Sequence, residues 1–233
     1  MRNPVLVALD VATAEEAVRL ARAVAPHVGG FKIGLGLLLG PGPATVSALA
    51  GLGKPVFADA KLHDIPSQVE RAAHQLGRVG ARWVTAHVAG GIDMLEAAVS
   101  GLRSGNAEGG ILGVTVLTSL DAAALAGVGI PVTPGKLVSR MARAASAAGC
   151  EGVVCSPREL AVVGEVAPEL VRVAPGIRPA GKADDDQRRV ATPREALARG
   201  ATYLVIGRPI TNADDPVEAA AAIESGLGAT PRT

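Results

Sequence analysis

The sequence is poor in aromatic residues and has no excess charge of one sign. Phe, Trp and Tyr make up 2% of the 233 residues, which leaves few rings for the stacking surfaces of single-stranded nucleic-acid binders. The 23 Lys and Arg residues nearly balance the 22 Asp and Glu residues, so no basic field attracts nucleic acid or an anionic membrane. We therefore expect neither a nucleic-acid nor a membrane partner, and any anion must be bound by a local site.

Cysteine and long apolar runs are also scarce. Cys150 and Cys155 are too few for a disulfide framework, and no Cys-x-x-Cys pair or His cluster predicts a zinc site. The most apolar uncharged stretch, 109–120, is interrupted by Gly and Thr and is shorter than the roughly 20 residues that a membrane helix needs. The apolar run before Asp10 is too short for a secretory signal. We expect a cytoplasmic protein without a disulfide or a metal ion.

Short apolar runs rich in β-branched residues alternate with Ala-rich amphipathic stretches along the chain. This alternation is typical of βα units that form a parallel sheet. Each run is nearly continuous in apolar residues, as is usual for strands buried on both faces. The predicted strands span residues 5–9, 30–33, 56–60, 83–86, 111–116, 152–155, 170–174 and 203–206.

The number of units predicts the architecture. Eight units in 233 residues give about 29 residues each, which suits a single-domain (β/α)8 TIM barrel over residues 1–233, with 228–233 as a loose tail. An open doubly wound sheet is the structural alternative. No Gly-x-Gly-x-x-Gly opens the first helix, so the usual dinucleotide signature of that alternative is missing.

Two predicted helices begin at recognisable capping residues. Thr13 precedes a helical pattern over 14–25 and has Glu16 three positions later, as in a capping box. Thr192 precedes Pro193 and is followed by Glu195, a combination typical of a helix start.

Charged residues occur where the predicted strands end, which is where barrel enzymes carry their chemistry. The first strand leads to Asp10, the second contains Lys32, and the third runs into Asp59 and Lys61. Asp59 and Lys61 are two residues apart on an extended segment, so we expect both side chains to face the barrel mouth. A purely structural salt-bridge network is the alternative. Buried ion pairs are weak stabilising devices, which favours a functional site.

The segment Asp59-Ala60-Lys61-Leu62-His63-Asp64-Ile65-Pro66 resembles the signature of the orotidine 5'-phosphate decarboxylase family. The resemblance spans nearly the whole chain. Further matching motifs, in the same order, are Ala8-Leu9-Asp10, Phe31-Lys32-Ile33-Gly34, Leu117-Thr118-Ser119, Pro175-Gly176-Ile177-Arg178-Pro179 and Ile206-Gly207-Arg208-Pro209-Ile210.

The resemblance implies a cofactor-free decarboxylation of orotidine 5'-phosphate to uridine 5'-phosphate (UMP), in pyrimidine biosynthesis, by a homodimer of barrels. Lys61 matches the residue that protonates C6, and Asp59 matches the carboxylate beside the substrate carboxylate. Lys32 and Asp10 match residues that order the charged array and hold the ribose hydroxyls. Asp64 matches a residue that reaches into the neighbouring subunit's site, so both sites would be shared.

Further substrate contacts are implied at the other strand ends. The loops after strands seven and eight commonly bind phosphate in barrels, and Arg178, Gly207 and Arg208 lie there, offering guanidinium groups and a backbone amide. The resemblance adds Gln187 as a phosphate contact, and Thr118 and Ser119 as contacts to the pyrimidine amide. It also implies contacts from the signature segment, at Ile65 and Gln68.

The chain departs from the family pattern at two places. Ser67-Gln68 stands where the family commonly has Asn-Thr, and Asp185 stands where it usually has Gly. The first departure removes a hydroxyl at position 68, which puts the local substrate contacts in doubt but not the reaction.

Two other functions fit parts of the pattern. Magnesium-dependent sugar-phosphate lyases and decarboxylases of the same suprafamily share the Asp-x-Lys-x-x-Asp spacing, but their metal needs an acidic ligand from the second strand. The cationic Lys32 at that place would repel the ion. A non-catalytic phosphate-binding barrel would be indicated by loss of a charged residue from the array, and none is lost.

Overall fold

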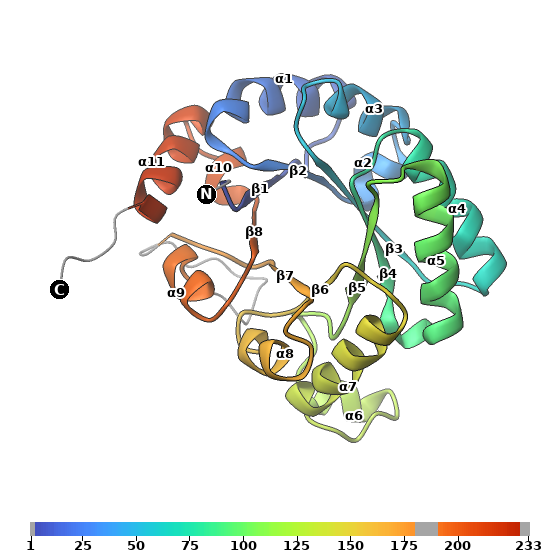
Figure 1. Cartoon of the computed structure of the whole chain (residues 1–233). Coiled ribbons are helices and arrows are strands. Elements are labelled where there is room, and N and C mark those ends of the chain that lie inside the picture. Colours follow the sequence, from blue (N-terminus) through green and yellow to red (C-terminus); the bar gives the residue numbers. More distant parts are fainter. Residues whose placement is uncertain (1–2, 180–190, 229–233) are drawn as a thin grey trace.

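The computed structural model describes residues 3–179 and 191–228. Eight parallel strands form a closed barrel in which each strand pairs with the next and β8 pairs with β1 (Figure 1). The predicted (β/α)8 barrel is confirmed, and the open doubly wound alternative is wrong. The strands are β1 (Val5–Ala8), β2 (Gly30–Ile33), β3 (Val56–Leu62), β4 (Trp83–His87), β5 (Gly110–Val114), β6 (Gly152–Val154), β7 (Val171–Ala174) and β8 (Tyr203–Ile206).

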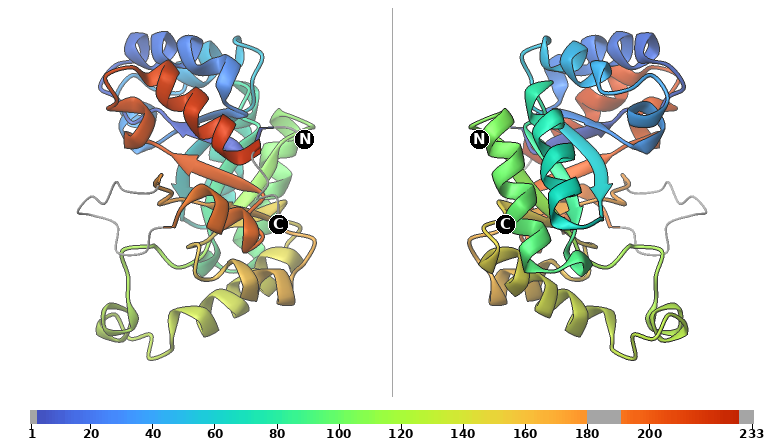
Figure 2. Two further views of the ribbon diagram at one scale, coloured as in Figure 1. Left: turned by 90° about the vertical axis from the view of Figure 1, so that its left-hand side faces the viewer. Right: turned by 90° about the vertical axis from the view of Figure 1, so that its right-hand side faces the viewer.

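Helices surround the barrel between successive strands (Figure 1). The α-helices are α1 (Ala14–Val24), α2 (Leu35–Leu39), α3 (Ala44–Ala50), α4 (Pro66–Arg78), α5 (Ile92–Gly105), α6 (Ala122–Gly127), α7 (Pro134–Ala147), α8 (Leu160–Val166), α9 (Pro193–Ala198), α10 (Arg208–Thr211) and α11 (Pro216–Gly228). Two 3-10 turns, η1 (Ala25–His27) and η2 (Val88–Gly90), complete the described helices. In the side views, the connection after β5 carries α6 away from the barrel wall before α7 returns along it (Figure 2).

The two predicted helix starts carry the expected caps. The Thr13 side chain accepts a hydrogen bond from the Glu16 backbone N–H at 3.1 Å. At α9, Thr192 and Glu195 form a reciprocal capping box: Thr192 N–H donates to Glu195 Oε2 at 2.8 Å, and Glu195 N–H donates to Thr192 Oγ1 at 3.3 Å. Such caps satisfy backbone donors that the first helical turn leaves without partners.

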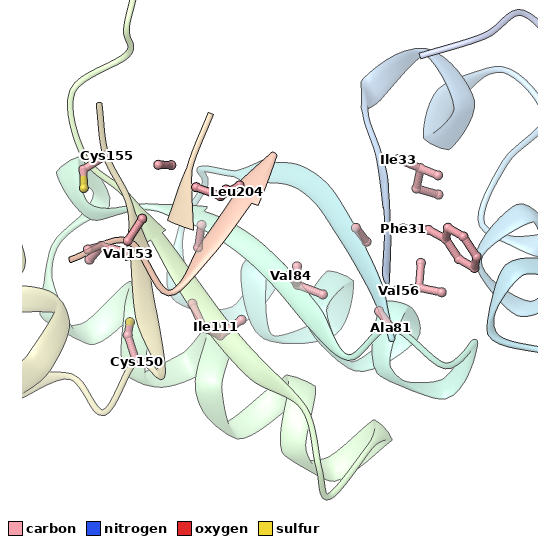
Figure 3. Close-up of a cluster of buried hydrophobic side chains, with 14 of the residues drawn as sticks. Phe31, Ile33, Val56, Ala81, Val84, Ile111, Cys150, Val153, Cys155 and Leu204 are labelled. Atoms are coloured by element: carbon pink, nitrogen blue, oxygen red, sulfur yellow. The ribbon is translucent and has the colours of Figure 1, made fainter. Parts of the chain in front are cut away.

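The hydrophobic core has two parts, and these show which strand side chains point outward and which point into the barrel. The larger part packs between the strands and the outer helices, and in Figure 3 Phe31 and Ile33 point from β2 toward the same outer side. A smaller cluster fills the barrel interior, formed by Leu6, Phe57, Trp83, Leu112 and Val173. Because strand side chains alternate, Lys32 faces the interior, between the two outward residues of β2.

Two further observations concern the carboxyl-terminal end of the described chain and the character of its helices. Helix α11 ends at Gly228, where the sequence predicts a tail to begin; the rest of that tail lies outside the described residues and stays a prediction. Within residues 3–179 and 191–228, no helix combines the length and apolar character that a bilayer crossing requires.

Candidate active site

A cavity of about 560 Å³ opens at the carboxyl ends of the strands. Its lining comes from both halves of the barrel, from β1, β2 and β3 on one side and from the ends of β5 to β8 on the other. The predicted site residues that line it are Asp10, Lys32, Asp59, Lys61, Thr118, Arg178, Gly207 and Arg208.

Two ion pairs form a charged array at one side of the cavity, which we call the mouth array (Asp10, Lys32, Asp59 and Lys61). Lys32 Nζ donates to both carboxylate oxygens of Asp10, at 2.8 and 3.0 Å. Lys61 Nζ donates to Asp59 Oδ2 at 2.6 Å. The Lys32 side chain is 9% exposed, whereas the Lys61 side chain is 32% exposed. The array therefore offers two ammonium groups and two carboxylates to one enclosed space.

The backbone that carries Asp59 and Lys61 is not regularly extended, which corrects the sequence-based expectation. Lys61 has φ +48°, and it is the only described residue other than glycine with a positive φ. Ala58 pairs with Val84 and Leu62 pairs with Ala86, so β3 advances four residues while β4 advances two. The extra residues form a bulge. Asp59 and Lys61 do meet, but at an irregular turn of the strand and not through simple alternation.

Thr85, which was not predicted from the sequence as a site residue, holds this irregular segment. Thr85 lies in β4 and is fully buried. Its Oγ1 accepts a hydrogen bond from the Lys61 backbone N–H at 2.8 Å and donates one to Asp59 Oδ1 at 2.9 Å. A single hydroxyl within the otherwise apolar start of a buried strand was the available signal, because a buried polar group needs partners.

Two imidazoles lie beside the mouth array. The rings of His63 and His87 have centroids 5.3 Å apart. Burial lowers the pKa of His87 below its usual 6.5, and the nearby His63 and Lys61 lower it further, while Asp59 opposes them. His87 is therefore a neutral imidazole at neutral pH.

Another part of the cavity wall is formed by the loops after β7 and β8, and β8 lies directly beside β1. Arg178 is buried; its Nη1 donates to the Ile177 carbonyl at 3.2 Å and its backbone N–H donates to the Ala191 carbonyl at 3.0 Å. Gly207 precedes α10, and Arg208 is the first residue of that helix. Two guanidinium groups thus reach the same cavity from neighbouring strand ends. The predicted contact Gln187 lies outside the described residues.

Four predicted residues are not brought into the cavity of their own chain. All four are exposed and absent from the residues that line it: Asp64, Ile65, Gln68 and Ser119. Asp64 Oδ1 accepts a hydrogen bond from the Ile65 backbone N–H at 2.6 Å, so this carboxylate is held locally at the end of β3. The shared site between two chains that was predicted for Asp64 stays a prediction.

The lining also includes polar residues that the sequence analysis did not select. Thr211 and Asn212 lie at the end of α10, and Cys155 follows β6. Burial raises the pKa of the Cys155 thiol to about 12, so it is not a nucleophile at neutral pH. No three His, Cys, Asp or Glu side chains among residues 3–179 and 191–228 come together as a metal-ligand group.

The comparisons with known proteins agree with this arrangement. The family model for the orotidine 5'-phosphate decarboxylase / HUMPS family matches residues 3–223. The chain therefore belongs to this family of barrel proteins.

Within the family, the similar curated proteins carry one name. The chain is 53% identical over 221 residues to the orotidine 5'-phosphate decarboxylase of Anaeromyxobacter sp. strain K, covering 94% of this chain and 96% of the relative. It is 50% identical over 236 residues to that of Thermobifida fusca, covering 99% and 100%. The crystal structure of the Lactobacillus acidophilus decarboxylase aligns with a TM-score of 0.86 at 33% identity, covering 97% and 100%. The sequence-based identification of an orotidine 5'-phosphate decarboxylase is confirmed.

Proposed function

We propose that the cavity converts orotidine 5'-phosphate to UMP and carbon dioxide, with Lys61 as the proton donor. The observation that carries this proposal is the contact of Lys61 Nζ with Asp59 Oδ2 at 2.6 Å, at the mouth of a cavity lined by both residues. The reaction is the one for which the similar proteins are named. We expect it to need no cofactor.

The chemistry requires a cation at the reacting carbon. When the bond between C6 and the carboxyl carbon breaks, carbon dioxide leaves and the electron pair stays on C6. The ammonium of Lys61 stabilises this developing negative charge and then donates a proton to C6, after which solvent reprotonates the lysine. Asp59 accepts a hydrogen bond from Lys61 Nζ at 2.6 Å and so orients the ammonium group in the cavity.

The remaining mouth residues orient the substrate. Lys32 is nearly buried and is held by both oxygens of Asp10, so its ammonium has a defined position. Asp10 is 61% exposed at the cavity edge, where its oxygens can accept hydrogen bonds from the ribose hydroxyls. We assign Lys32 to ordering the array and Asp10 to binding the ribose.

The phosphate binds at the part of the cavity that the loops after β7 and β8 form. Arg178 and Arg208 supply guanidinium groups that match phosphate oxygens, and Gly207 allows close approach of the backbone. Gln187 is proposed as a further phosphate contact. Thr118 lines the cavity after β5 and is assigned to the pyrimidine amide, with Ser119 beside it in the chain. Binding energy from the phosphate, which does not react, lowers the barrier at C6.

The active unit is proposed to be a homodimer with shared sites. Asp64, Ile65 and Gln68 are exposed and lie outside their own cavity, which leaves them available to a second chain. Among the described residues, four of the seven exposed large apolar side chains follow three successive strands, β2, β3 and β4. They are Leu35, Leu39, Ile65 and Ile92; the other three lie elsewhere. In an isologous dimer, each chain gives Asp64 to the partner's site and receives the same residue in return.

A magnesium-dependent lyase of the same family fits this site less well. Such an enzyme needs free carboxylate oxygens from neighbouring strands. Asp10 accepts two hydrogen bonds from Lys32, and Asp59 accepts one from Lys61, so ammonium groups occupy the positions where a metal ion would be held.

The substrate of the decarboxylase is a charged nucleotide that does not cross membranes freely, which favours a cytoplasmic location.

The test is the loss of ultraviolet absorbance of orotidine 5'-phosphate with purified protein, with and without EDTA. We expect turnover that EDTA does not change and that Lys61→Ala lowers by at least about 10⁴-fold, because one group supplies both charge stabilisation and the proton. Lys136→Ala, a lysine on the outer helix α7, is the matched control and should retain full activity. Unchanged turnover in Lys61→Ala, or turnover of a sugar phosphate only when magnesium is added, would overturn the proposal.

The shared site has its own test in a mixture of two inactive variants. A heterodimer of Lys61→Ala and Asp64→Ala has one site with both residues intact and one site with neither. Random exchange of subunits should therefore restore about a quarter of wild-type activity. No recovery after exchange, although native mass spectrometry shows mixed dimers, would mean that each site is complete within one chain.

A further inference from the structure

The hydroxyl group of Thr85 forms hydrogen bonds with both members of the Asp59–Lys61 unit. Thr85 Oγ1 accepts from the Lys61 backbone N–H at 2.8 Å and donates to Asp59 Oδ1 at 2.9 Å. The other oxygen of Asp59 accepts from Lys61 Nζ at 2.6 Å. The Thr85 side chain is buried with no exposed area, so both hydrogen bonds are protected from water.

The bulge in β3 explains why a side chain is needed at this place. Between the pairs Ala58–Val84 and Leu62–Ala86, three residues of β3 stand opposite Thr85 alone. A regular ladder cannot supply backbone partners for all three. The Thr85 hydroxyl takes the place of a backbone carbonyl for the Lys61 N–H, and so stabilises the residue at φ +48°, a conformation that side chains other than glycine adopt rarely.

We propose that Thr85 is a positioning residue for the decarboxylation, acting through Asp59 and Lys61 without touching the substrate. The inference rests on the proposed function of Lys61. One hydrogen bond fixes the rotation of the Asp59 carboxylate, so that Oδ2 meets the lysine ammonium, and the other fixes the backbone from which the Lys61 side chain starts. Together they hold Nζ at the place where the negative charge on C6 develops, and such placement matters because errors near 1 Å are costly in rate.

The experiment compares Thr85→Val, which keeps the shape and loses the hydroxyl, with Thr85→Ser, which keeps the hydroxyl. We expect kcat to fall by about 10²-fold in Thr85→Val, and KM to change by less than about threefold, because substrate-binding groups are untouched. Thr85→Ser should keep kcat within about threefold of the wild type.

A matched control is Thr45→Val on α3. Thr45 is 1% exposed, and within the part of the chain that the structure describes its hydroxyl has no hydrogen-bond partner. This variant removes a buried hydroxyl away from the cavity, so we expect wild-type kcat and KM. Thermal unfolding of all three variants checks that they are folded at the assay temperature.

A second measurement is independent of turnover: hydrogen exchange of the Lys61 backbone amide. We expect this amide to exchange faster in Thr85→Val than in the wild type, and to be protected again in Thr85→Ser. Wild-type kcat in Thr85→Val, or equal losses in Thr85→Val and Thr85→Ser, would overturn the positioning role. If the wild type itself did not turn over orotidine 5'-phosphate, the proposed function would fail, and unchanged exchange in Thr85→Val would separately overturn the role of Thr85.

Discussion

The two ends of the barrel both carry ion pairs, but these are built for different purposes. At the amino-terminal ends of the strands lies a group that we call the base network (Arg82, Trp83 and Glu151). Arg82 donates to both Glu151 oxygens at 2.7 and 2.8 Å, and Trp83 Nε1 donates to Glu151 Oε1 at 2.8 Å. Arg82 also lies 4.8 Å from the centre of the Trp83 ring. Every member of the base network is held by at least two contacts.

The mouth array has the opposite character. Its cations are lysines, which are flexible point charges, whereas the base uses a rigid bidentate arginine. Lys61 combines an unfavourable backbone conformation with a side chain that faces the cavity. Strain of this kind is typical of functional sites. We therefore expect the charged groups at the base to stabilise the fold and those at the mouth to bind a ligand, as is usual for the two ends of such barrels.

Apart from loss of Lys61, the largest effect should come from removing a phosphate-binding charge at the mouth, which should leave the fold intact. We expect Arg208→Ala to lower kcat/KM by about 10²–10³-fold, because a charged contact to phosphate is lost, and added phosphite dianion to restore part of the activity. The melting temperature should stay within about 2 °C of the wild type. Steady-state kinetics measures kcat/KM, and calorimetry measures the melting temperature. Arg199→Ala, an exposed arginine at the other end of the barrel, is the control, and normal capture of substrate by Arg208→Ala would show that the phosphate site is misplaced.

The next effect should come from the base network, where a substitution should lower the stability of the fold and leave kcat unchanged. Glu151→Ala leaves Arg82 and the Trp83 indole without their shared acceptor. We expect the free energy of unfolding to fall by about 2 kcal/mol, and the melting temperature by about 4–8 °C, while kcat is unchanged. Urea unfolding followed by circular dichroism measures the first. Glu165→Ala, on the outer helix α8, should have little effect. A loss of kcat with no loss of stability in Glu151→Ala would contradict the assignment of the base network to stability and the mouth array to catalysis.

A smaller effect isolates the strain at the mouth. Lys61→Gly and Lys61→Ala both remove the ammonium, and they differ only in the backbone freedom at φ +48°. Glycine usually destabilises relative to alanine because its unfolded chain is freer, but a positive φ reverses this order. We expect Lys61→Gly to be more stable than Lys61→Ala by about 1 kcal/mol. Chemical denaturation measures the free energy of unfolding of both variants. If Lys61→Ala were the more stable of the two, the backbone conformation at position 61 would not be strained.

The smallest effect is on the pH dependence of stability. The pKa of His87 is lowered in the folded chain, so the unfolded chain binds more protons below the usual value of 6.5. The contribution of neutral His87 to stability is therefore present above about pH 6.5. It is lost as the pH falls below 6.5 toward the lower pKa that His87 has in the folded chain. We expect His87→Asn to show a shallower loss of stability between about pH 7 and pH 5, by at most about 1.4 kcal/mol per pH unit. Identical pH slopes would contradict this expectation.

The sequence predicted the barrel and one side of the site well for a physical reason. Alternation of apolar runs and helical patterns is local, and the ends of parallel strands meet at one edge, so the pattern alone was enough to place Asp10, Lys32 and Asp59 together. The irregular β3 could not be predicted in this way. At its bulge the Lys61 backbone N–H donates to the side chain of Thr85, 24 residues further along the chain, and no local pattern encodes such a contact.

The exposed Asp64 illustrates a second limit. Its predicted role depends on another copy of the chain, and a motif shows only that the residue is present, not which cavity it enters. Likewise, the family pattern names Ser119 beside Thr118, but only Thr118 lines the cavity. Neighbouring residues in a loop can point in different directions, since no regular backbone constrains them.

The base network also gives the protein a built-in optical probe. Trp83 is the only tryptophan in the chain, and its ring lies 5.0 Å from that of Tyr203 inside the base of the barrel. Tryptophan emission therefore reports on opening of the base, at the opposite end of the strands from the cavity. Folding can be followed by fluorescence while a ligand occupies the mouth, and ligand binding should leave the emission nearly unchanged.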